Sequence, residues 1–192
     1  MNIAMRAVAM IVHPTAEWPR IEKEADDPAY LLSRYVALLA LIPPLFGFIG
    51  ACLIGATMPG VGTVRASLFD GIFGAIFGYI ATIASVLLLG LIIDLLAPVF
   101  GGRKNFDSAF QLAVYSYTPV WLAGIFLLLP GLRFLVLTGF YGAYVFSLGL
   151  PQLMKSSEQK SSTYIAVIVA CAFLLTYAAA AMQRAVFGTP GL

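Results

Sequence analysis

The sequence predicts an all-α polytopic membrane protein, a compact bundle of five transmembrane helices with interfacial helices at its N-terminus. Of the 192 residues, 61% are hydrophobic and only 10% are charged, whereas about a quarter of the residues of soluble proteins are charged. Five long apolar runs fill the chain from about Arg34 to its end, and one helical crossing needs roughly 20 apolar residues. The short polar loops between these runs alternate in charge.

These runs divide the chain into an N-terminal segment, residues 1–33, and a membrane domain, residues 34–192. Eight of the eleven basic residues fall in the N-terminal segment, at Arg34 directly after it, and in the second and fourth loops; the other three are Arg65, Arg133 and Arg184. The positive-inside rule then puts the N-terminus in the cytoplasm and the C-terminus outside, and we expect a bacterial inner membrane. The crossings are expected near residues 34–57, 69–97, 109–129, 132–153 and 163–186.

The N-terminal segment divides at Pro14 into two short amphipathic pieces. Residues 2–12 are expected to form a helix on the membrane surface, and the second piece places Trp18 and Ile21 on one stripe with Arg20 elsewhere. A tryptophan at the level of the headgroups is an ordinary interfacial anchor. Trp18 and Arg20 are therefore candidates for contact with lipid headgroups or with a cytoplasmic protein, and the sequence leaves both open.

Prolines interrupt two of the predicted spans. Pro43 and Pro44 lie inside the first span, and Pro119 lies midway along the third. Each lacks an amide hydrogen and displaces the carbonyl four residues before it. At membrane depth such a carbonyl needs a partner in the protein or in a water-lined cavity.

Small residues follow one face of the second span at helical spacing. This stripe lets helix backbones approach closely, since packing drives helix association in lipid. Both packing within one bundle and a homo-oligomer interface fit the pattern. The stripe consists of Gly71, Gly74, Gly78, Ala81 and Ser85.

Asp94 is the carboxylate expected inside a span, about one turn from the cytoplasmic end of the second crossing. A carboxylate at mid-helix costs on the order of 2.5–3.5 kcal/mol and usually faces the bundle interior. Tyr115 and the Pro43-Pro44 break lie at comparable depth, so we expect a polar cluster on the cytoplasmic side. A structural hydrogen bond, or a carboxylate that reaches the interface, is the other interpretation of Asp94.

The loop after the second span is the next candidate site. Gly101 and Gly102 permit a tight turn with φ > 0. Arg103 and Lys104 follow directly and are expected to face cytoplasmic headgroups, each adding on the order of 1 kcal/mol near an anionic surface. The same two charges also fit a plain turn that helps to set the topology.

Several features in order resemble the YIP family of five-span membrane proteins, in particular its short bacterial-type members. The eukaryotic members are associated with Rab GTPases and with Golgi and endoplasmic-reticulum trafficking. Asp27-Pro28-Ala29-Tyr30 only partly matches the family's Asp-Leu-Tyr-Gly-Pro signature, so the resemblance implies fold and topology more than GTPase binding. It rests on Pro14, Trp18, Ile21, the Gly101-Gly102 pair, Tyr117-Thr118-Pro119 and Pro130-Gly131.

The residue types available inside the predicted spans argue against an enzyme and against a bound cofactor. The single histidine, His13, lies outside the spans, so no intramembrane Ser–His pair and no His-based zinc site is expected. No catalytic residue, cofactor or metal is expected, and a net charge of +2 gives no nucleic-acid footprint. The resemblance implies a non-enzymatic protein that binds a protein partner or organises the membrane. The alternative is a small transporter, channel or lipid-translocating protein that uses the cluster around Asp94.

Overall fold

The computed structural model describes residues 2–24, 26–58, 60 and 62–187. Within these residues, five helical stretches are long and apolar enough to cross a membrane. They confirm the predicted all-α membrane bundle, and the first stretch begins six residues earlier than predicted, at Pro28. The five stretches are Pro28–Ile54, Leu68–Phe100, Phe106–Leu128, Pro130–Met154 and Gln159–Val186.

The first span is assembled from short helical pieces. Residues Ala40 and Leu41 form a turn between α4 and α5, just before Pro43 and Pro44 in the first turn of α5. The hydroxyl of Tyr79 donates to the carbonyl of Ala37 at 3.0 Å. A carbonyl beside the break thus has a partner in a neighbouring helix, as the membrane interior requires. The pieces are α3 (Pro28–Tyr30), η1 (Leu31–Val36), α4 (Ala37–Leu39), α5 (Ile42–Phe48) and η2 (Ile49–Ile54).

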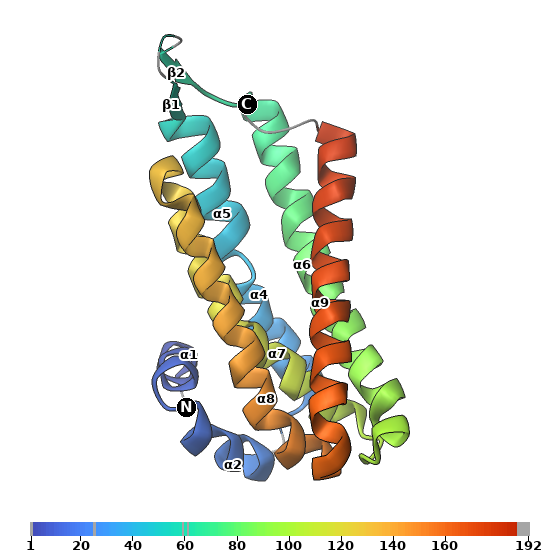
Figure 1. The fold of residues 1–192 in the computed structure, drawn as a ribbon. Helices are drawn as coiled ribbons and strands as arrows, with labels where there is room; N and C mark the ends of the chain where they lie inside the picture. Colours follow the sequence, from blue (N-terminus) through green and yellow to red (C-terminus); the bar gives the residue numbers. More distant parts are fainter. Residues whose placement is uncertain (1, 25, 59, 61, 188–192) are drawn as a thin grey trace.

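A short β-hairpin links the first two spans and was not predicted. Strand β1 (Ala56–Met58) pairs antiparallel with β2 (Gly62–Val64). Ala56 lies opposite Val64. The second span follows as α6 (Leu68–Leu96) and η3 (Ala97–Phe100). Figure 1 shows the hairpin at the same end of the bundle as the start of α6 and the C-terminal end of α9.

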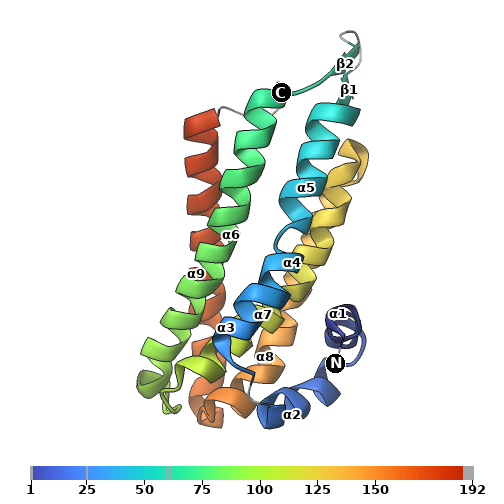
Figure 2. The same ribbon diagram turned by 180° about the vertical axis from the view of Figure 1, so that it is seen from behind.

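Helix α7 (Phe106–Ala123) is the central helix of the bundle. Two thirds of its span is buried, a larger share than in the other four. It packs against α6 on one side and α8 on the other, and Figure 2 shows the same arrangement from behind. The remaining helices are η4 (Gly124–Leu128), η5 (Pro130–Phe140), α8 (Tyr141–Met154) and α9 (Glu158–Phe187).

Toward the hairpin end the helices form two groups, α5 with η4 and η5, and α6 with α9 (Figure 1). The two groups stay in contact where α5 packs against α6. Toward the opposite end, α1 (Ile3–Val12) packs against α7, and α2 (Pro14–Glu24) packs against α8. The N-terminal helices therefore pack against the bundle with one face each.

Candidate functional site

A buried ion cluster joins the two N-terminal helices. Arg6 and Glu17 are each less than 5% exposed, and the Arg6 Nη1 to Glu17 Oε2 distance is 2.8 Å. Arg6 also pairs with Glu24, and Arg20 donates to the other oxygen of Glu17 at 2.6 Å. Because each buried charge has a partner, the cluster can exist away from water. It fixes α1 against α2.

Trp18 is fully buried and packs inside the protein, so its ring is not on the surface of α2; its depth relative to the headgroups stays a prediction. Its indole N–H donates to the carbonyl of Val145 in α8 at 3.1 Å. Gly149, one turn further along α8, leaves the space in which the ring lies, since a Cβ there would meet Trp18 Cε2 at 2.5 Å. The stripe predicted on α2 therefore faces the bundle. Arg20 is exposed, and its contact with headgroups or a partner stays a prediction.

Tyr115 has a different partner from the one expected. Its hydroxyl donates to Oδ2 of Asp26 at 2.9 Å. Its ring lies edge-on to Trp18 and to Tyr35, with centroids 6.4 and 5.1 Å apart. The guanidinium carbon of Arg6 lies 5.9 Å from the ring centroid. Tyr115 therefore belongs to the interface between the N-terminal segment and the bundle.

The predicted convergence of Asp94 with the proline break is wrong. Asp94 is 5% exposed, and its Oδ1 has no hydrogen-bond partner among the described residues. Pro44 lies beside Gly78, which is about 24 Å from Asp94 along α6 at 1.5 Å per residue. Pro43 lies against Gly124 at the end of α7, and Pro119 is buried within α7. The prediction placed Pro43 and Pro44 by counting residues from the expected start of the first span. Because that span begins earlier than predicted, the two prolines lie further from its start than expected.

The glycine pair after the second span joins two loops. Gly101 has φ +74°, as expected for the tight turn. A Cβ on Gly102 would meet the carbonyl oxygen of Met154 at 2.9 Å, and that carbonyl accepts the amide of Arg103 at 2.8 Å. The pair therefore holds this loop against the end of α8. Arg103 and Lys104 remain exposed, and their contact with lipid stays a prediction.

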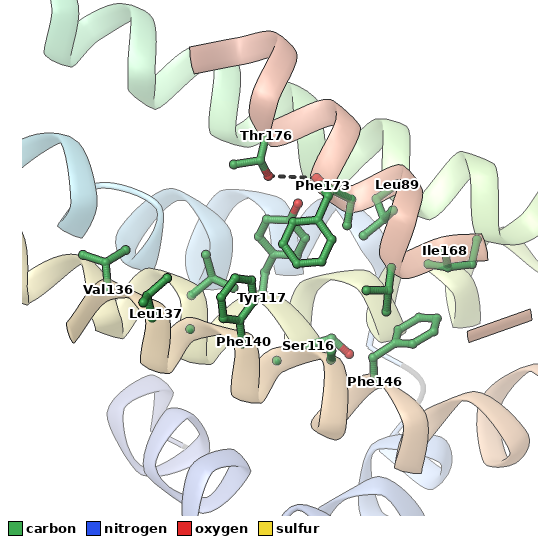
Figure 3. Close-up of a pocket in the computed structure, with 16 residues that line it drawn as sticks. Leu89, Ser116, Tyr117, Val136, Leu137, Phe140, Phe146, Ile168, Phe173 and Thr176 are labelled. Atoms are coloured by element: carbon green, nitrogen blue, oxygen red, sulfur yellow. Dashed lines mark hydrogen bonds between the residues drawn. The ribbon is translucent and has the colours of Figure 1, made fainter. Parts of the chain in front are cut away.

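An apolar pocket of about 280 Å³ lies among α6, α7, η5, α8 and α9. Figure 3 shows Tyr117 of α7 pointing toward Phe173 and Thr176 of α9. Phe140 and Phe173 line the pocket and are about half exposed on the outside of the bundle. The pocket therefore reaches the surface that faces lipid. Ser116 also lines it, and its buried Oγ has no partner among the described residues.

A larger hollow of about 740 Å³ lies between the two groups of helices toward the hairpin end. The small-residue stripe of α6 lines it. Part of the stripe packs within the bundle, as one of the two alternatives expected, and the homo-oligomer interface stays a prediction. Gly71 does make a close contact, since a Cβ there would meet Cys52 Sγ at 2.2 Å, but a Cβ at Gly78 would meet nothing closer than 3.8 Å. Arg65, Asp70 and Arg133 line the same hollow.

The hollow and the apolar pocket adjoin. Tyr117, Val120, Val136 and Thr176 line both. Trp121 lines the hollow, is 1% exposed, and its indole N–H has no acceptor among the described residues. The sequence did not single out Trp121, Arg133 and Thr176 as lining a cavity. The available signal was that each carries a polar or basic group within an apolar span, where neither contact with lipid nor the positive-inside rule requires one.

The described residues contain no cluster of metal-ligating side chains. In the part of the chain that the structure describes, no three His, Cys, Asp or Glu side chains lie close enough to hold a metal ion. Asp94 lines neither of the two cavities. The fold and the cavities thus define a five-span integral membrane protein with an internal space open toward lipid.

The chain belongs to the Yip1 domain family, whose pattern matches residues 8–181. It is 28% identical over 168 residues to inner membrane protein YohC of Escherichia coli strain K12, an overlap that covers 85% of this chain and 86% of the relative. The same figures hold for inner membrane protein YohC of Escherichia coli O6:H1. No solved structure matches the chain. The resemblance to the YIP family stated from the sequence is thereby confirmed.

Proposed function

We propose that this protein is a non-enzymatic, membrane-organising protein of a bacterial inner membrane that holds a bilayer lipid between its helices. The orientation that we propose places the N-terminus in the cytoplasm and the hairpin end outside. One observation carries the proposal: the apolar pocket between α8 and α9 adjoins the hollow through Tyr117 and Thr176. A lipid has an apolar acyl chain and a polar headgroup. The apolar pocket suits the acyl chain, and the hollow suits the headgroup.

The lining of the apolar pocket supports a lipid occupant. Phe140 and Phe173 line it and are about half exposed, so an acyl chain can enter it from the surface. The lining is almost wholly apolar, which disfavours water. An acyl chain from the adjacent bilayer can fill this space without crossing a barrier of polar groups. The hollow of 740 Å³ also falls within the range of small-molecule sites.

The other functions considered from the sequence are less well supported by these contacts. Transport through a cluster around Asp94 would need that carboxyl to face a cavity, and it lines neither chamber. Binding of a protein partner through the stripe of Trp18 and Ile21 would need these side chains to be exposed, but both are buried against the bundle. The outer face of α1, with Met5, Val8 and Val12 exposed, suits the boundary between headgroups and acyl chains.

The test compares two matched variants of α9 for lipid retained through purification in mild detergent. Ala172 lines the apolar pocket, whereas Ala178 is exposed and lines neither cavity. Ala172→Phe should fill the pocket and lower the moles of phospholipid per mole of protein, while Ala178→Phe should retain the wild-type value. Equal lipid content in all three folded proteins, or no lipid in the wild type, would refute the proposal.

A further inference from the structure

We infer that the hollow selects a phospholipid with an anionic headgroup, whose phosphate lies at the mouth between Arg65 and Arg133. This inference rests on the proposed function and adds the charge class of the ligand. The two arginines come from different elements: Arg65 follows β2, and Arg133 belongs to η5. Both line the hollow, so each could supply donors to a phosphate bound there.

The positive-inside rule does not explain the presence of arginines at this end of the bundle. The positive-inside rule depletes lysine and arginine on the outer side of a membrane. Of the three arginines there, Arg65 and Arg133 line the hollow and Arg184 does not. Neither Arg65 nor Arg133 forms an ion pair with another described residue, since each ion pair found there involves the N-terminal segment. The Nε of Arg65 donates to the carbonyl of Ile54 at 3.5 Å, which leaves its two Nη groups for a phosphate. Together with the guanidinium of Arg133 they offer a fork of donors that suits a phosphate.

Asp70 also lines the hollow, in the first turn of α6. It offsets one of the two positive charges, so the mouth retains about one net positive charge. The N-terminal end of α6, a helix of 29 residues, adds a partial positive charge at the same place. A monoanionic headgroup therefore matches the mouth better than a zwitterionic one.

Below the mouth, the hollow offers room for the rest of the lipid. Gly74 and Gly78 line the wall of α6, and a Cβ at Gly78 would be in ordinary contact only. Deeper still, the indole N–H of Trp121 has no acceptor among the described residues. A buried donor without an acceptor costs about 1–3 kcal/mol in free energy, and the ester carbonyls of a glycerolipid would supply one. Tyr117 and Thr176 then mark the passage into the apolar pocket (Figure 3).

The sequence provides a reporter for this site because it contains only two tryptophans, Trp18 and Trp121. The variant Trp18→Phe leaves Trp121 as the single fluorophore. It is reconstituted into phosphatidylcholine vesicles that contain an equal fraction of either phosphatidylglycerol or phosphatidylcholine brominated on the acyl chains. Bromine quenches tryptophan on contact, so quenching reports which lipid occupies the hollow. The variant Trp121→Phe, with Trp18 enclosed by α2 and α8, controls for lipids around the bundle.

We expect brominated phosphatidylglycerol to bind beside Trp121 about fivefold to tenfold more tightly than brominated phosphatidylcholine, the effect of about one net charge. Arg133→Gln should reduce this preference nearly to one, and Arg133→Lys should keep most of it. The matched control is Arg184→Gln, at the same end of the bundle but outside the hollow, which should keep the full preference.

The outcomes separate the two proposals. Equal quenching by the two brominated lipids, or equal effects of Arg133→Gln and Arg184→Gln, would overturn the inference about the headgroup while leaving a bound lipid. If neither brominated lipid quenches Trp121 more than it quenches Trp18, no lipid occupies the hollow, and the proposed function itself fails.

Discussion

Glu17→Ala should release the N-terminal helices from the bundle. The Glu17 side chain is 2% exposed and accepts hydrogen bonds from Arg6 at 2.8 Å and from Arg20 at 2.6 Å. Removing one member of a buried ion pair costs about 3–5 kcal/mol, because the other charge is left buried. Since Glu24 still pairs with Arg6, we expect a loss near the lower end of this range, about 3 kcal/mol.

Glu22→Ala is the matched control, on the same helix. It removes an ion pair to Lys155 in which the side chains are 41% and 49% exposed, and pairs of this kind contribute about 0–1 kcal/mol. The measurement is thermal unfolding in detergent in a Trp121→Phe background, followed by the emission of Trp18. At about 2–4 °C per kcal/mol for chains of this length, Tm should fall by roughly 6–12 °C for Glu17→Ala and by at most about 4 °C for Glu22→Ala.

Replacing both buried partners extends this test. The double variant Arg6→Met/Glu17→Leu removes two buried charges together and should unfold near or above the wild-type temperature. Equal Tm values for Glu17→Ala and Glu22→Ala would refute the reasoning, because they would show that the buried cluster does not hold the N-terminal helices in place.

Two further variants test the packing described above. Gly149→Val brings a Cβ to within 2.5 Å of the Trp18 ring and should lower the free energy of unfolding by about 1–3 kcal/mol. Gly78→Ala is the control: its Cβ meets no atom closer than 3.8 Å, so the free energy of unfolding should stay nearly unchanged. Equal losses for the two variants would contradict the packing of Trp18 against Gly149. Asp94→Leu should raise the free energy of unfolding by about 1–3 kcal/mol, because a buried carboxyl oxygen without a partner is replaced by apolar surface. A lower stability than wild type in the same thermal assay would show that Asp94 binds a partner.

The spans were predictable because hydropathy over about 20 residues is a local property. Four of the five begin within four residues of their predicted starts, at Leu68, Phe106, Pro130 and Gln159. The first was misplaced at its start because Arg34 looked like a boundary. In the structure, this arginine lies inside the helical stretch that begins at Pro28.

The packing of the N-terminal segment was not predictable from its local pattern. A charged and amphipathic helix with a tryptophan fits a membrane surface as well as it fits a protein groove. Arg6 and Glu17 are 11 residues apart on different helices, so no helical spacing connects them. The burial of Trp18 depends on the absence of a side chain at Gly149, more than 100 residues away in the sequence.

The hollow could not be predicted from the sequence for a related reason. A stripe of small residues such as Gly74 and Gly78 has the same spacing whether it faces a helix or an open space. Only the positions of α5 and α9 relative to α6 decide between the two. That decision turns a predicted packing face into the wall of a candidate lipid site.

A lipid in the two adjoining cavities would be seen directly in a structure at side-chain resolution, determined in nanodiscs that contain phosphatidylglycerol. We expect continuous lipid density from a phosphate beside Arg133, past Tyr117 and Thr176, into the pocket lined by Phe140 and Phe173. A hollow closed by contact between α6 and α5, or one that holds only ordered water, would contradict this expectation.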